Sequence, residues 1–290
     1  MMKGVGVWLA RGIVAAAVLL TGGRLGDPAP SPTARALALV RSQDFTPIFD
    51  MAGRRVDAYF DPRKTDQFID ELFGLSGKWK AVTRGRESYE RHVRKVFEER
   101  VCNARGFESV LGQIRGDYDY GLRAAENRLL VALYDDVRPS RPDLSFEALR
   151  AEYRDLASAL APDVLRDLGM NLVSIVGSDA AAVLFVAAVS STGILGTSVA
   201  AGATGSPLTF GLSLAAGLVA GIALDALVGD AYEDAARMEV RRQVNALRNQ
   251  AIDDVHAALA QALLAYRTLQ ERCVIRLYEG EFHERLSHRP

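Results

Sequence analysis

Residues 180–224 read AAAVLFVAAVSSTGILGTSVAAGATGSPLTFGLSLAAGLVAGIAL and contain no Asp, Glu, Lys, Arg or His. A helix needs about 20 apolar residues to span a hydrocarbon core of roughly 30 Å. Two segments of that length are present, at 180–199 and 208–228, and residues 200–207 between them contain glycines and a proline, which favour a turn. The stretch therefore predicts an antiparallel transmembrane helical hairpin.

Small residues at four positions predict how the two helices of this hairpin pack. With the turn near residue 203, Ser190 and Ser191 face Gly217, and Gly221 follows Gly217 by four residues. Small residues let membrane helices approach closely, as in the GxxxG motif. A buried hairpin inside a soluble helical protein is the alternative, because a helix that is apolar on all sides is also typical of a protein core.

Two carboxylates, Asp179 and Asp225, bracket the charge-free stretch and should lie at the same face of the membrane. Ionisable groups at membrane depth often line an ion or proton path. At the interface they are usually hydrated ends of a span, and this is the interpretation we prefer.

The N-terminus has the pattern of an export signal. Lys3 and Arg11 precede the apolar run 12–20, and small residues follow at 21–23. A basic region, a short apolar core and a small-residue cleavage zone are typical of a signal peptide. Residues 1–23 are therefore predicted to be a signal peptide or, as the alternative, an uncleaved membrane anchor, with residues 24–33 forming a Pro-rich linker.

The next part of the chain, residues 34–169, is predicted to be a helical domain without strands, because apolar residues recur at helical and not at alternating spacing. We expect Thr65 to cap one helix. Pro162 is expected near the start of the helix that leads into the hairpin region, residues 170–229. The expected helices cover residues 34–60 (interrupted before Pro47), the segment after Thr65, and residues 87–101, 107–137 and 145–160.

Residues 230–290 are predicted to form a long amphipathic helix that reaches about Tyr278. Its apolar stripe indicates packing on the helical domain 34–169 in one bundle, or self-association as a coiled coil. The stripe comprises Val240, Val244, Leu247, Ala251, Val255, Leu259, Leu263, Tyr266 and Leu269.

The charge balance limits the partners that can be expected. The chain has 35 basic and 36 acidic residues, so its net charge gives no general attraction to nucleic acid, and none is expected as a partner. The strong preference for Arg over Lys and the abundance of Ala suggest a GC-rich bacterial genome.

Cys102 and Cys273 are the only cysteines. If the domain is exported, they could form one disulfide; otherwise they are buried thiols, and the sequence favours neither alternative. Two distant cysteines without a CxxC motif do not form a zinc site.

Four partial motifs are candidates for sites of chemistry, and each departs from its pattern. The segment 74–78 (GLSGK) lacks the spacing of a phosphate loop, and the tail segment around His283 lacks the spacing of a zinc-protease helix. Asp253 with His256 lacks a second ligand set, and Asp117 and Asp119 point apart on a helix. No catalytic residue, cofactor or metal ligand is predicted.

Together these features predict an all-α, membrane-associated bundle with an apolar hairpin and a long C-terminal helix. The expected function is non-enzymatic, as a bacterial envelope protein at the inner membrane that interacts with the bilayer and with a protein partner or a second copy of itself. Its soluble parts are expected to be periplasmic if the N-terminal signal is used, and cytoplasmic if it is not.

The alternative function is a pore or channel. A charge-free helical hairpin in an otherwise charged helical protein resembles the hydrophobic hairpin of pore-forming colicins. The resemblance covers only residues 180–224 and includes no specific motif, so it is an analogy at the level of the fold.

Overall fold

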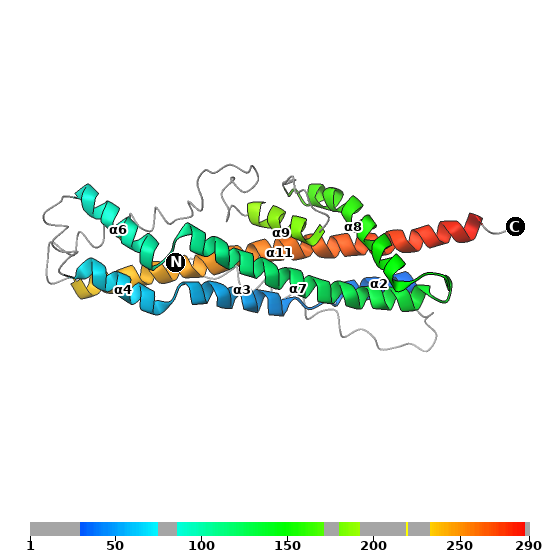
Figure 1. Cartoon of the computed structure of the whole chain (residues 1–290), viewed down its shortest axis with the longest axis horizontal. Helices are drawn as coiled ribbons and strands as arrows, with labels where there is room; N and C mark the ends of the chain where they lie inside the picture. The colour runs from blue at the N-terminus through cyan, green and yellow to red at the C-terminus, as the bar shows by residue number, and fades with distance from the viewer. Residues whose placement is uncertain (1–29, 75–85, 171–179, 192–218, 220–232, 288–290) are drawn as a thin grey trace, which may run out of the picture.

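The computed structural model describes residues 30–74, 86–170, 180–191, 219 and 233–287. These residues form helices joined by short turns, with no strand among them, which confirms the all-α prediction. Figure 1 shows an elongated bundle in which one helix runs almost the whole length of the molecule.

That helix is α11 (Glu233–Ser287). Its 55 residues make a rod about 80 Å long at 1.5 Å per residue. Every residue of the apolar stripe predicted from the sequence is buried or half-buried on this helix, because the stripe faces the other helices of the bundle. The same core cluster contains buried residues from every part of the described chain, so the bundle has one core.

Three consecutive helices lie along α11 and together cover most of its length. They are α2 (Pro32–Arg41), α3 (Thr46–Tyr59) and α4 (Pro62–Phe73).

Ion pairs give the direction of this packing. Arg241 on α11 contacts Asp66 on α4 at 2.7 Å, and Arg41 on α2 contacts Glu271 near the other end of α11 at 2.8 Å. As residue numbers rise along α11 they fall along its neighbours, so the packing is antiparallel.

Local chemistry explains where α3 and α4 begin. Pro47 lies in the first turn of α3, where its missing N–H costs no hydrogen bond, and the chain breaks before it as predicted. The cap of α4 is Asp61, whose carboxylate accepts a hydrogen bond from the Arg63 amide at 2.9 Å. The prediction that Thr65 is this cap is wrong: Thr65 is inside α4 and is buried.

The remaining long helices complete the bundle. They are α6 (Arg86–Arg100), α7 (Ala104–Val137) and α8 (Phe146–Asp167). Asn103 caps α7, and Ser145 caps α8. Arg55 on α3 pairs with Asp117 on α7, and Arg35 on α2 pairs with Asp136 at 2.8 Å, so α7 is antiparallel to α2 and α3.

The predicted helix boundary at Pro162 is not found. Pro162 lies inside α8, which continues to Asp167, and the chain turns at Gly169 with a φ of 65°. Buried residues on both sides of the proline, including Ala157, Ala161 and Val164, hold the helix against the bundle. Tertiary packing therefore compensates for the hydrogen bond that the proline removes.

Candidate functional site

The described part of the charge-free stretch begins as the helix α9 (Ala180–Ser191), which carries no charged residue. It lies against α7, α8 and α11 at the middle of the bundle. Leu184 and Ala187 have no exposed surface, and Phe185 and Val189 are at most 5% exposed. Residues predicted to enter a membrane are therefore part of the protein core in this structure.

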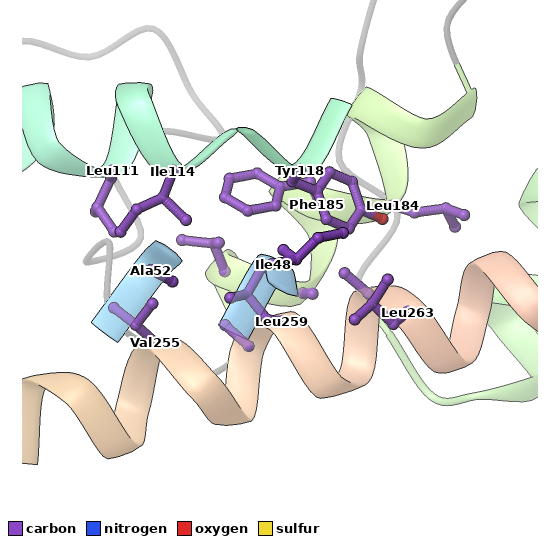
Figure 2. Close-up of a cluster of buried hydrophobic side chains, with 14 of the residues drawn as sticks. Ile48, Ala52, Leu111, Ile114, Tyr118, Leu184, Phe185, Val255, Leu259 and Leu263 are labelled. Carbon is purple, nitrogen blue, oxygen red and sulfur yellow. The ribbon is translucent and has the colours of Figure 1, made fainter. Parts of the chain in front are cut away.

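Figure 2 shows buried side chains of α9 in one cluster with those of α3, α7 and α11, and Ile48 of α3 lies between α7 and α11. Phe185 meets Tyr118 of α7 with ring centroids 5.1 Å apart and planes tilted by 45°. Leu184 lies near Leu263 of α11. We call the surface formed by Ile48, Tyr118, Leu259 and Leu263 the α9 seat.

The face of α9 that points away from the α9 seat is also apolar. Ala181, Val183 and Val186 are only half-buried, yet each packs partly on the core. A helix with apolar residues on its buried and outer faces suits a lipid environment as well as a protein interior.

The structure tests the predicted hairpin residues only in part. Ser190 and Ser191 are the last two residues of α9, whereas Gly217, Gly221, Asp179 and Asp225 lie outside the described residues. Among the described residues, no helix combines the length and the apolar character that crossing a bilayer requires. Val219, from the second apolar segment, has no exposed surface and belongs to the same core cluster as α9.

A polar cluster lies in the core beside the α9 seat. We define it as Tyr118 and Glu126 of α7, Tyr153 of α8, and Tyr266, Gln270 and Cys273 of α11. The hydroxyl of Tyr266 lies 3.4 Å from the Leu122 carbonyl oxygen and 3.5 Å from a Glu126 carboxylate oxygen, and its single proton is donated at long range toward these two acceptors.

Burial controls the ionisation of this polar cluster. Desolvation is the main reason that the pKa values of Tyr153 and Tyr266 are well above the ordinary value. Burial, assisted by the negative charge of Glu126, raises the pKa of the Cys273 thiol to about 12. These phenols and this thiol are therefore neutral in the folded bundle at physiological pH.

Gln270 is the least compensated member of the polar cluster. It has no exposed surface, and neither its amide oxygen nor its amide nitrogen has a hydrogen-bond partner among the described residues. Gln270 lies beside Tyr153 and lowers the pKa of its phenol, against the larger effect of burial. An unpaired buried amide weakens the packing around it. The sequence patterns did not identify Gln270. It directly follows the predicted stripe residue Leu269 and is itself part of no predicted pattern.

The two cysteines are free and buried, which is the thiol alternative of the sequence analysis. Cys102 lies near Tyr59 of α3. Two residues before Tyr59, Asp57 contacts Arg248 of α11 at 3.5 Å, so Cys102 lies near the part of α11 around position 248. Cys273 is 25 residues further along that helix, or about 37 Å. A disulfide needs Cα atoms within about 7 Å, so the disulfide alternative does not fit this structure.

The other candidate residues have structural contacts. Asp117 is bound by Arg55 in a two-pronged ion pair. His256 lies 3.1 Å from the Phe49 carbonyl and stacks edge-on against the Phe49 ring, while Asp253 is exposed. No group of three metal-ligating side chains occurs within the described residues.

Of the two terminal motifs, only parts are described. The segment 74–78 lies outside the described residues except for Gly74, at the end of α4. In the tail segment, His283 belongs to α11 by its backbone.

The chain matches no protein-family model, no curated protein and no solved structure.

Proposed function

We propose that the protein is a non-enzymatic helical bundle of the bacterial envelope that attaches to the inner membrane through its charge-free stretch and acts by structural or partner interactions. The observation that carries the proposal is α9, a helix with no charge and with apolar residues on both its buried and its outer face. The bilayer is its first partner, and a protein or a second copy of the chain is the partner of the bundle. We propose that the soluble parts lie in the periplasm, with the cytoplasm as the alternative if the N-terminal signal is not used.

Insertion of the first predicted span and packing of α9 on the α9 seat exclude each other. A span of about 20 residues requires the whole segment 180–199. The 12 residues of α9 belong to that segment, so a packed α9 leaves only 192–199 for the bilayer. Membrane attachment through this segment therefore requires two states, one with α9 on the bundle and one with α9 in the lipid.

The hydrophobic effect determines which environment can accept α9. Leu184, Phe185 and Val189 are almost fully buried, and exposing three such side chains to water costs roughly 5–8 kcal/mol. Lipid tails are as apolar as the protein core, so transfer into a bilayer avoids most of that cost. A nearby membrane, and not water, is the environment that would draw α9 from the bundle.

The test is flotation of the chain with liposomes at neutral pH. The parent and its variants would lack residues 1–23, whose own apolar run would otherwise hold the chain to lipid. We expect the parent to float and a deletion of 180–224 to remain at the bottom. A parent chain that does not float would contradict the proposal.

A point variant avoids the risk that the deletion damages the bundle. Val186 is half-buried on the outer face of α9, so Val186→Lys leaves the α9 seat in contact while a charge at the bilayer centre costs about 2.5–3.5 kcal/mol. We expect Val186→Lys to reduce flotation. Val131→Lys, at an exposed position of α7, is the matched control and should float like the parent.

A second candidate function is pore formation. It is favoured because the apolar helix α9 packs in the core of an otherwise charged bundle. Dye release from liposomes tests it. Release that disappears when Gly217 and Gly221 are replaced by Leu would support a pore. Flotation without release at any protein concentration would leave membrane attachment as the function.

A further inference from the structure

We propose that the polar cluster around Gln270 is a weak joint in the bundle, which lets α8 and α9 separate from α11 and so regulates the release of α9 to the membrane. This inference rests on the proposed membrane function and adds the part of the bundle that controls it.

The contacts of the polar cluster connect α9 to α8 through the core. Phe185 of α9 packs on Tyr118 of α7 at 5.1 Å between ring centroids. Tyr118 and Tyr153 each lie within electrostatic reach of Tyr266 on α11 and raise its pKa, after the larger effect of burial. Tyr153 in turn lies beside Gln270 and Cys273. Removing α9 therefore uncovers one end of a continuous row of polar groups.

The chemistry of this row favours opening. A buried polar group gains hydration when a core opens, whereas a buried apolar group loses free energy. Gln270 gains most, because neither of its amide atoms has a hydrogen-bond partner among the described residues.

Among the described residues, ion pairs link α11 more often to the α2–α4 side than to α8. Arg41, Arg237 and Arg241 each link α11 to the α2–α4 side at 2.7–2.8 Å. Arg272 links α11 to α8 through Asp167, near the point where α8 ends. We therefore place the opening between α11 and the α8–α9 pair.

The native cysteines report on two separate parts of the molecule. Cys273 has no exposed surface and belongs to the polar cluster, so a water-soluble maleimide reaches it when the joint opens. Cys102 is 4% exposed and lies near Tyr59, far from the joint, so its labelling reports opening of the whole bundle.

The experiment uses the full chain in liposomes of phosphatidylethanolamine and phosphatidylglycerol, with two measurements. Peptide mass spectrometry gives the maleimide labelling rates of Cys273 and Cys102. A photoreactive phospholipid confined to the acyl region gives the adducts formed on residues 180–191. The variant is Gln270→Met, which removes the amide at nearly constant volume and helix propensity. Gln270→Leu is the second variant.

We expect Gln270→Met to slow Cys273 labelling about tenfold, equivalent to about 1.4 kcal/mol, and to reduce lipid adducts on α9 by a similar factor. Cys102 labelling should not change. Gln250 is exposed on the same helix, so Gln250→Met is the matched control and should change neither measurement.

Two outcomes would overturn the inference. If Cys102 labelling slows as much as Cys273 labelling, the substitution only stabilises the whole bundle. If Cys273 labelling slows but the lipid adducts on α9 do not change, the joint does not control α9. If the parent forms no adducts at all, the proposed function fails. The labelling of the two cysteines then tests the joint by itself. Slower labelling of Cys273 but not of Cys102 in Gln270→Met supports the joint, and a Cys273 labelling rate equal to that of the parent rejects it.

Discussion

Gly121 on α7 lies directly against Ile48 of α3, one of the residues of the α9 seat. A Cβ at this position would lie 2.8 Å from Cδ1 of Ile48, closer than real Cβ contacts come, and 3.0 Å from Cγ1, which is tighter than most. Glycine costs about 1 kcal/mol in a helix interior relative to alanine. The close approach of α3 and α7 offsets that cost.

We predict that Gly121→Ala lowers the free energy of unfolding by roughly 1–2 kcal/mol, because Ile48 must leave its rotamer in a packed core. Adding Ile48→Val removes Cδ1 and should restore part of that loss, so the double variant is more stable than the two single changes predict. A methyl group added at Gly116 would meet no neighbour within 4 Å, so Gly116→Ala is the control and should be neutral or stabilising. Thermal unfolding followed by circular dichroism measures all of these variants beside the parent. Equal stabilisation by both alanines would contradict the argument.

At the scale of elements, α4 and α11 have a register that their side chains specify. α4 buries Phe68, Ile69 and Leu72 and places Asp66 at the surface of the bundle, beside Arg241. Both side chains of that pair are about half exposed, so the ion pair adds at most about 1 kcal/mol. The buried face of α4 therefore supplies most of the docking energy, and the charges select the register.

A cross-link tests this register. We predict that Asp66→Cys combined with Arg241→Cys is joined efficiently by a short bis-maleimide, because the native side chains meet at 2.7 Å. Asp66→Cys with Arg248→Cys is the control, since position 248 lies seven residues, or about 10 Å, further along the helix. Efficient linkage of the control pair, or none of the test pair, would show a different register.

At the scale of the whole molecule, the bundle keeps its two cysteines far apart. Cys102 lies near Tyr59, and Cys273 lies about 37 Å away along α11. Burial raises the pKa of the Cys102 thiol to about 11, and that of Cys273 is about 12, so both are protonated and unreactive at neutral pH.

We predict that the folded chain contains two free thiols that react with a thiol reagent only slowly until denaturant is added. Oxidation of the folded chain should give no intramolecular disulfide, which non-reducing electrophoresis and intact mass would detect. Rapid formation of that disulfide without denaturant would require a fold in which the two cysteines are neighbours.

The sequence predicted the helices well where the periodicity was regular. The stripe on α11 followed from spacing alone, because a long helix with one apolar face must bury that face. Pro162 was misjudged as a helix start, because spacing does not show the packing that holds α8 together on both sides of the proline.

The sequence could not predict the position of α9 or the members of the polar cluster, and the reasons differ. A helix without charges is compatible with both lipid and a protein core, so the sequence around Leu184 and Phe185 does not show which of the two surrounds them. The members of the polar cluster come from α7, α8 and α11, and only the tertiary fold brings them together. The prediction of a membrane hairpin remains a prediction for residues outside the described ranges.

The buried phenols and thiols have a consequence in alkali. Their folded pKa values are raised, to about 11 for Cys102 and about 12 for Tyr89 and Cys273, whereas in an unfolded chain they ionise near 9.0 for Cys and 10.0 for Tyr. The unfolded chain therefore loses protons first, and stability that is complete below pH 9 declines as the pH rises toward 12. Carbonate washing, which is used to strip adsorbed proteins from membranes, would weaken this bundle and free α9 beside the lipid. The chain should accordingly be held more firmly by membranes after an alkaline wash than before it.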